Sequence, residues 1–194
     1  MKRLALSAGL ALLAAPALAH TGQGDAHGFL HGVLHPLTGP DHLLAMLAVG
    51  LWSGFVLPNR FWAGAATFMG AMAVGAGLSW AGVPYPAVET VIVASVVVFG
   101  LLVLLSRRDQ PQWQTAASLG AIALFASAHG HAHATEATGT ILPYLAGFLI
   151  STLALHLAGI GIARSVANRT AARVLQGGIG LGIAASGLYL LMAG

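Results

Sequence analysis

The sequence predicts an all-α, polytopic membrane protein with about six transmembrane helices after a cleaved signal peptide. Of its 194 residues, 57% are hydrophobic and only 7% are charged, which is too little polar surface for a soluble domain. The mean hydropathy is +0.84, and the apolar residues gather into segments near the length that crosses a bilayer. Residues 20–194 are therefore expected to form one transmembrane domain.

Residues 1–19 have the three parts of a secretory signal peptide. A positively charged start precedes an apolar core at 4–15, and a small-residue cleavage motif ends at Ala19. The alternative is a retained first transmembrane helix, but the apolar run is short for a span. Cleavage would expose His20 outside the cytoplasm, where its α-amine and imidazole would form a chelating pair.

Gly, Pro, Asn and charged residues separate the six apolar segments that follow. The predicted spans are residues 41–57, 61–80, 88–105, 113–128, 141–163 and 174–192. Small residues recur every four positions in the sixth span, so we expect a packing seam at Gly178, Gly182 and Ser186. Tryptophans near span ends are expected to form aromatic belts: Trp52, Trp62, Trp80 and Trp113.

The basic residues predict the orientation of these spans. Loops at 58–60, 106–112 and 164–173 hold every Lys or Arg after the signal peptide, whereas 81–87 and 129–140 hold none. The positive-inside rule places the first group in the cytoplasm and the mature N-terminus in the periplasm of a bacterial inner membrane. The formal charge of +3 is scattered rather than clustered, so we expect a lipid bilayer and no nucleic acid as partner.

The candidate chemistry begins in residues 35–42, directly before the first span. His35, Asp41 and His42 lie where an apolar helix starts, and ionisable groups beside hydrocarbon usually serve ion pathways. Met46 follows His42 by one helical turn and could add a thioether. The chain has no cysteine, so the ligand set favours Ni, Co, Zn or Cu(II) over Cu(I) or structural zinc.

Structural roles compete for part of this segment. Thr38 and Asp41 match a helix-capping pattern, which would satisfy free amides at the start of the first span. His27, His31 and His35 follow one another at intervals of four residues, so a helix would place them on one face. This spacing predicts an amphipathic helix that breaks before Pro36. A polar face with incidental histidines is the alternative for this helix.

A second histidine-rich tract, residues 129–136, is predicted to be a loop on the periplasmic side. Its composition suits metal binding, with flexible surface histidines as the alternative. The candidate ligands in this tract are His129, His131, His133 and Glu136.

Two further ionisable residues lie within the predicted spans. Glu89 begins the third span, where the helix dipole would also favour a carboxylate. His156 lies roughly 22 Å along the fifth helix, past the midplane towards the cytoplasm. It is a candidate for a later metal station, and the alternative is a buried neutral histidine bonded to a carbonyl.

The segment from residue 35 onwards resembles the HupE/UreJ family of nickel or cobalt permeases, whose first-helix motif is H-P-x-x-G-x-D-H-x-x-x-M-x-x-V-G. The matching residues are His35, Pro36, Gly39, Asp41, His42, Met46, Val49 and Gly50. A later family motif, H-G-x-A-H-G-x-E, is matched by His129, Gly130, Ala132, His133 and Glu136, while Ala134 replaces its second Gly. The resemblance covers essentially the whole chain.

The resemblance implies a secondary transporter that imports Ni²⁺ or Co²⁺, with His35, Asp41 and His42 as metal-handling residues. The metal is cargo, so no resident cofactor is expected, and it would supply the maturation of nickel- or cobalt-dependent enzymes. No G-x-x-x-x-G-K-[ST] loop for ATP occurs. Coupling is therefore expected from an ion gradient, the membrane potential or a separate partner.

Two other classes compete with a transporter. A metal receptor or sensor would bind the ion at the periplasmic face without moving it. A rhomboid-like intramembrane serine protease would pair Ser186 with His156, but Ala184 stands where that family's G-x-S-G motif has Gly, and no H-E-x-x-H metalloprotease motif occurs. We therefore do not expect an enzyme.

Overall fold

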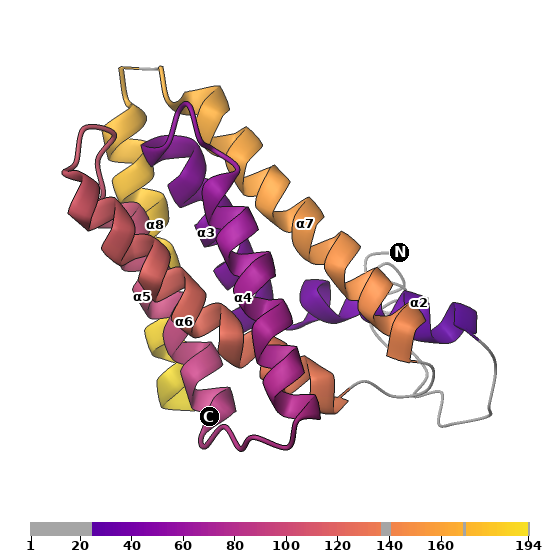
Figure 1. The fold of residues 1–194 in the computed structure, drawn as a ribbon. Helices are drawn as coiled ribbons and strands as arrows, with labels where there is room; N and C mark the ends of the chain where they lie inside the picture. Colours follow the sequence, from indigo (N-terminus) through magenta and orange to yellow (C-terminus); the bar gives the residue numbers. More distant parts are fainter. Residues whose placement is uncertain (1–24, 137–140, 169, 194) are drawn as a thin grey trace, which may run out of the picture.

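The computed structural model describes residues 25–136, 141–168 and 170–193, and this part of the chain contains helices joined by loops and no strands (Figure 1). The predicted signal peptide, its cleavage point and His20 lie outside the described residues. A short helix, α2 (Asp25–Thr38), comes first. Six helices then correspond to the six predicted spans: α3 (Pro40–Val56), α4 (Ala63–Trp80), α5 (Val88–Leu105), α6 (Gln112–Glu136), α7 (Ile141–Val166) and α8 (Ala172–Ala193).

The lengths and compositions of these helices suit a bilayer. Helices α5, α7 and α8 are each long and apolar enough to cross a membrane, judged by length and composition alone. Helix α3 is also apolar but has only 17 residues. Together with the composition, these helices establish an all-α polytopic membrane protein.

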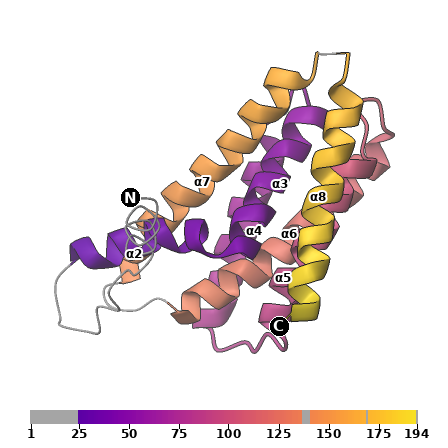
Figure 2. The ribbon, with the colours of Figure 1, turned by 180° about the vertical axis from the view of Figure 1, so that it is seen from behind.

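Helix α3 lies inside the bundle, and Figure 2 shows it flanked by α7 and α8. It also contacts α4 and α5, and from Ala45 to Val56 every residue except Leu47 is buried. A helix that is apolar on all sides belongs in the interior. The central position of α3 brings its first turn, with Asp41 and His42, against several other helices.

The tightest helix contacts form at glycines. A Cβ atom at these positions would collide with the backbone of the facing helix, so only glycine permits the observed approach. Lipid gives apolar helices little reason to associate, and small residues allow the backbones to touch. The pairs are Gly75 and Gly130 between α4 and α6, Gly100 and Gly180 between α5 and α8, Gly50 and Gly159 between α3 and α7, and Gly32 and Gly147 between α2 and α7.

The packing seam predicted on the sixth span is on the wrong face. Gly178 and Gly182 are exposed, and a Cβ added to either would meet nothing within 4 Å. Helix α8 instead packs on α5 through Gly180, Ala184 and Gly187. Both faces of α8 carry small residues at similar spacing, so periodicity alone did not distinguish them.

Of the four tryptophans predicted to form aromatic belts, three lie on the surface of the bundle and the fourth does not. Trp62, Trp80 and Trp113 are more than half exposed, whereas Trp52 is fully buried. The indole of Trp52 donates a hydrogen bond to Ser106 Oγ at 3.0 Å. A buried indole needs such a partner, and here it joins the end of α5 to α3.

The junction between α2 and α3 differs from the prediction. Helix α2 continues through Pro36 to Thr38, so the predicted break at His35 is wrong; packing against α7 holds the residue before proline in the helix. Thr38 Oγ1 bonds back to the carbonyls of Leu34 and His35, both at 3.2 Å. Thr38 therefore ends α2 and does not cap α3, whose N-cap is Gly39.

Candidate metal centre

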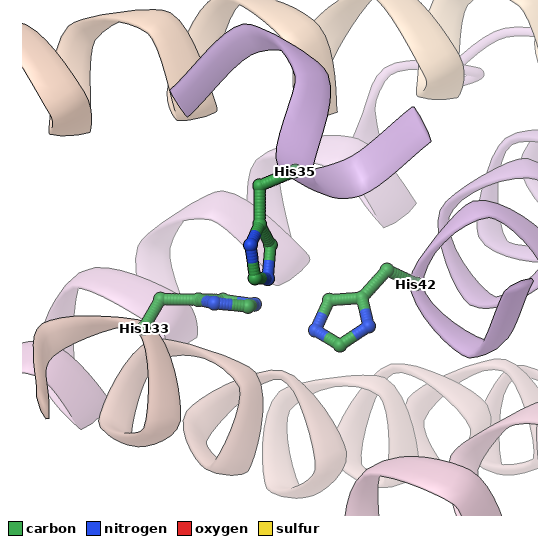
Figure 3. Close-up of side chains that lie close together, drawn as sticks. All are labelled: His35, His42 and His133. Atoms are coloured by element: carbon green, nitrogen blue, oxygen red, sulfur yellow. The ribbon is translucent and has the colours of Figure 1, made fainter. Parts of the chain in front are cut away.

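Three histidines from three helices converge where α2 meets the bundle (Figure 3). His35 comes from the last turn of α2, His42 from the first turn of α3 and His133 from the last turn of α6. One ring nitrogen of each lies within 4.8 Å of the others, and their ring centroids are 4.6, 4.7 and 5.4 Å apart. We call these three residues the histidine cluster.

The geometry of the histidine cluster suits a transition-metal ion. Imidazole nitrogens bind such ions at about 2.0–2.1 Å, so two ligands on opposite sides of one ion are about 4.2 Å apart. A small closing movement of the rings would bring all three nitrogens onto one ion. His42 and His133 are buried and His35 is half-buried, so His35 is the most accessible of the three ligands.

Asp41 lies behind His42 and orients it. Asp41 Oδ1 accepts hydrogen bonds from His42 Nδ1–H at 2.8 Å and from the His42 backbone N–H at 2.9 Å. Because Nδ1 carries the proton, Nε2 carries the lone pair, and this buried atom has no hydrogen-bond partner among the described residues. A carboxylate behind a histidine is a common device that fixes a metal ligand in position.

His129 extends the histidine cluster towards the interior. Its ring is fully buried and lies 5.0 Å from the ring of His42. Ser95 Oγ donates its own proton to the Ile92 carbonyl at 2.6 Å, so it accepts from His129 Nε2–H at 3.1 Å. His129 Nδ1 therefore keeps its lone pair, again without a hydrogen-bond partner in the described part of the chain.

The prediction that residues 129–136 form a periplasmic loop is wrong, because they are the last turns of α6. His129, His131 and His133 are at most 9% exposed, so the alternative of flexible surface histidines is wrong as well. Gly130 packs against the backbone of Met72 in α4. This close contact keeps the polar end of α6 helical and turns its imidazoles inward.

Of three further predicted ligands, two lie outside the histidine cluster. His131 Nε2–H donates to the Val83 carbonyl at 2.8 Å, and its ring faces Tyr85 at 5.5 Å, so it supports the connection between α4 and α5. Glu89 lies exposed in the first turn of α5. Glu136 ends α6, and its side chain lies outside the described residues.

The predicted helix that carries His27 and His31 is confirmed as α2. Both residues are exposed, and the His31 ring lies 6.0 Å from that of His35. Tyr144 of α7 is fully buried and contacts the rings of His31 and His35 at 5.6 and 6.3 Å. The face of α2 that bears these histidines thus leads from the surface to the histidine cluster.

His156 lies deeper in the bundle and is fully buried. Its Nδ1–H donates to the backbone carbonyl of Met46 at 2.8 Å. This is the hydrogen bond expected if His156 is a buried neutral histidine bonded to a carbonyl. The same bond leaves the lone pair on Nε2, which has no hydrogen-bond partner among the residues described. Met46 is itself fully buried and supplies its backbone oxygen to this contact.

The Ser186–His156 pair of the rhomboid-like alternative is not formed. Ser186 Oγ donates to the Gly182 carbonyl of its own helix at 2.9 Å, while His156 bonds to Met46 in α3. Each group has a different partner on a different helix, which removes the observation that favoured peptide hydrolysis.

The opposite end of the bundle has a different chemistry. Arg173 donates to the carbonyl of Ser106 at 2.8 Å, and Arg164 donates to the carbonyl of Pro58 at 3.3 Å. Arg107 and Arg108 line a cavity of about 460 Å³ together with Arg173. We call these four residues the arginine end.

Two residues near the site were missed by the sequence reasoning. Ser95 is the only polar side chain in residues 91–105. An isolated polar residue in an apolar span could have been recognised as a candidate hydrogen-bond partner inside the bundle. Phe68 carried no signal, because its position is defined only by ring contacts with His129 and His156 at 5.4 and 4.9 Å.

The fold and the site together define a polytopic helical membrane protein with a buried histidine cluster at one end. Comparison with known proteins then identifies the chain as a member of the HupE/UreJ family, whose model, described as HupE / UreJ protein, matches residues 8–190. Protein HupE of Rhizobium leguminosarum bv. viciae is 40% identical over 195 residues, which cover 95% of this chain and 98% of that protein. No solved structure matches the chain with significance.

Proposed function

We propose that this protein is a permease that imports a divalent transition-metal ion, Ni²⁺ or Co²⁺, from the periplasm to the cytoplasm. The observation that carries the proposal is the histidine cluster, whose three ligand nitrogens lie within 4.8 Å of one another. Imidazole is a suitable ligand for both ions. The nickel or cobalt transport implied by the family resemblance supports the same conclusion.

In this proposal His35, His42 and His133 form the first binding site. His35 is the most accessible and takes up the ion, and the two buried imidazoles then replace its remaining water. Asp41 does not need to touch the metal, because its carboxylate already bonds to His42 Nδ1. The Asp41 side chain is only 18% exposed. Its negative charge, transmitted through the imidazole of His42, offsets part of the positive charge of the bound ion.

His129 and His156 are the next stations towards the cytoplasm. Each has one nitrogen anchored by a hydrogen bond and one buried nitrogen with a lone pair. His131 bonds to the Val83 carbonyl instead, and Met46 contributes through its backbone carbonyl. The first site therefore needs only residues from α2, α3 and α6.

The proposed direction follows from the arrangement of charge. The histidine cluster faces the periplasm of a bacterial inner membrane, and the arginine end faces the cytoplasm, in accordance with the positive-inside rule. An inside-negative potential of 100 mV would favour inward movement of a divalent cation by about 4.6 kcal/mol. The imported metal would supply the maturation of nickel- or cobalt-dependent enzymes.

Reconstitution into liposomes that contain a metal-sensitive dye tests the proposal. We expect the wild-type protein to admit Ni²⁺ or Co²⁺ and H42A to lose both uptake and metal binding. H27A is the matched control, because His27 is exposed on α2 and outside the cluster. Normal uptake by H42A would refute the proposed site. Metal binding by the wild type without any flux would instead favour a receptor or sensor.

A further inference from the structure

We propose that Phe68 is a hydrophobic gate between the histidine cluster and His156. This inference rests on the proposed transport function and names the side chain that separates its outer and inner metal stations. Phe68 belongs to α4 and is fully buried. It was not among the residues that composition or motif had marked.

A continuous row of rings leads to Phe68 from the outside. The His42 ring lies 5.0 Å from that of His129, and the His129 ring lies 5.4 Å from that of Phe68. The Phe68 ring also lies 4.9 Å from that of His156. Phe68 is therefore the one member of this row without a ligand atom, and it contacts an imidazole of each proposed station.

The imidazoles on both sides of Phe68 are held in place. His129 Nε2 bonds to Ser95 Oγ, and His156 Nδ1 bonds to the Met46 carbonyl. Their other ring nitrogens, His129 Nδ1 and His156 Nε2, are buried and carry lone pairs without hydrogen-bond partners among the described residues. An ion could bind at either imidazole, while the phenyl ring itself offers nothing to replace lost water.

A hydrocarbon ring in a narrow ion path acts as a barrier, because apolar constrictions exclude water and hydrated ions. An ion can pass from His129 to His156 only when the ring of Phe68 moves aside. A cavity of about 210 Å³ lies one turn further along α4, where Met72, His133 and Phe148 are among its lining residues.

Phe99 distinguishes a gate from ordinary core packing. It is as deeply buried as Phe68 and contacts the rings of Phe68 and Phe125 at 6.4 and 5.7 Å. None of the ring contacts found in the described part of the chain joins Phe99 to a histidine. Phe99→Ala would therefore create a comparable cavity that borders Phe68 but contacts neither imidazole.

The test measures passive Ni²⁺ or Co²⁺ flux into dye-loaded liposomes, with the membrane potential clamped at zero. We expect Phe68→Ala to raise the flux at least about tenfold over wild type, which corresponds to a barrier lowered by about 1.4 kcal/mol. Phe68→Leu should give a smaller increase, and Phe99→Ala should leave the flux unchanged. Metal binding to the histidine cluster should stay at its wild-type level in all three variants.

The possible results separate the gate from the transport function on which it rests. If the wild-type protein carries no metal, the transport proposal itself fails. If the wild type carries metal and Phe68→Ala behaves like Phe99→Ala, the gate is refuted and transport stands. Thermal unfolding identifies a variant that does not fold; in that case Phe68→Leu, compared with Phe99→Leu, decides the question by the same criterion.

Discussion

The two ends of the bundle use nitrogen-containing side chains in opposite ways. In the histidine cluster and at His129, imidazoles turn inward towards one another, and Asp41 and Ser95 anchor one nitrogen of His42 and His129. At the arginine end, guanidinium groups donate to backbone carbonyls of Ser106 and Pro58. The first end thus presents lone pairs, and the second presents only N–H donors.

This difference teaches which end can accept a cation. When one nitrogen of a neutral imidazole donates its N–H to a partner, the other nitrogen keeps a lone pair that can bind a metal ion. Arginine stays protonated and has only N–H donors. The arginine end can tie loops together and favour one orientation in the membrane. Its four guanidinium groups supply no ligands to a metal ion, which agrees with the proposed entry at the histidine cluster.

The largest effect is expected from removing a ligand of the histidine cluster. His133→Ala should lower Ni²⁺ or Co²⁺ affinity by more than about 100-fold, beyond the 10–100-fold typical of outer-shell changes. His131→Ala is the control, since His131 lies two residues away in the same helix and bonds to the Val83 carbonyl. Titration of the purified variants checks this. Equal losses in both variants would show that the binding requires the whole tract.

The second prediction concerns the close backbone contact between α6 and α4 beside the histidine cluster. A Cβ at Gly130 would collide with the backbone of Met72, so Gly130→Ala should destabilise the fold by about 1–3 kcal/mol and weaken metal binding. Gly120→Ala in the same helix is the control, because a Cβ there meets nothing within 4 Å. Thermal unfolding measures the difference. An unchanged melting temperature for Gly130→Ala would contradict the packing of α4 on α6.

The third prediction sharpens the role of Asp41. Asp41→Asn keeps an oxygen that can accept from His42 Nδ1 but removes the negative charge, so metal affinity should fall about 10–100-fold. Asp109→Asn, an exposed change at the opposite end, should have no effect. Binding isotherms for both variants provide the measurement. Complete loss of binding in Asp41→Asn would instead indicate that the carboxylate contacts the metal directly.

The smallest effect is expected at the arginine end. Arg173 donates to the Ser106 carbonyl and to Gln176 Oε1, and hydrogen bonds of this kind contribute on the order of 1 kcal/mol. Arg173→Ala should therefore lower the melting temperature slightly and leave metal affinity unchanged. A marked loss of affinity in this variant would contradict the division of roles between the two ends.

Much of the fold followed from the sequence. Apolar segments predicted six helices, and five of them have bounds within three residues of the observed ones. The remaining helix, α6, extends eight residues beyond the end predicted for the fourth span. The prediction failed there because hydropathy assigns a histidine-rich tract to a loop. Only the contact of Gly130 with α4 shows that this tract is buried.

The candidate site was predicted in its residues but not in its geometry. The motif at 35–42 and the tract at 129–136 were both marked as metal-binding, yet their separation in sequence concealed that His133 completes the site of His35 and His42. The contacts of Phe68 with two histidines depend on how α3, α4, α6 and α7 pack.

By itself, the sequence determined the class of protein, the membrane segments and the ligand chemistry, because hydropathy, charge and residue type are local properties of the chain. Tertiary structure alone decided which face of α8 packs on α5, which histidines meet and which nitrogen of each holds its proton. These features depend on contacts between helices distant in sequence. Apolar helices with several small-residue faces allow more than one arrangement, and only the packed bundle selects among them.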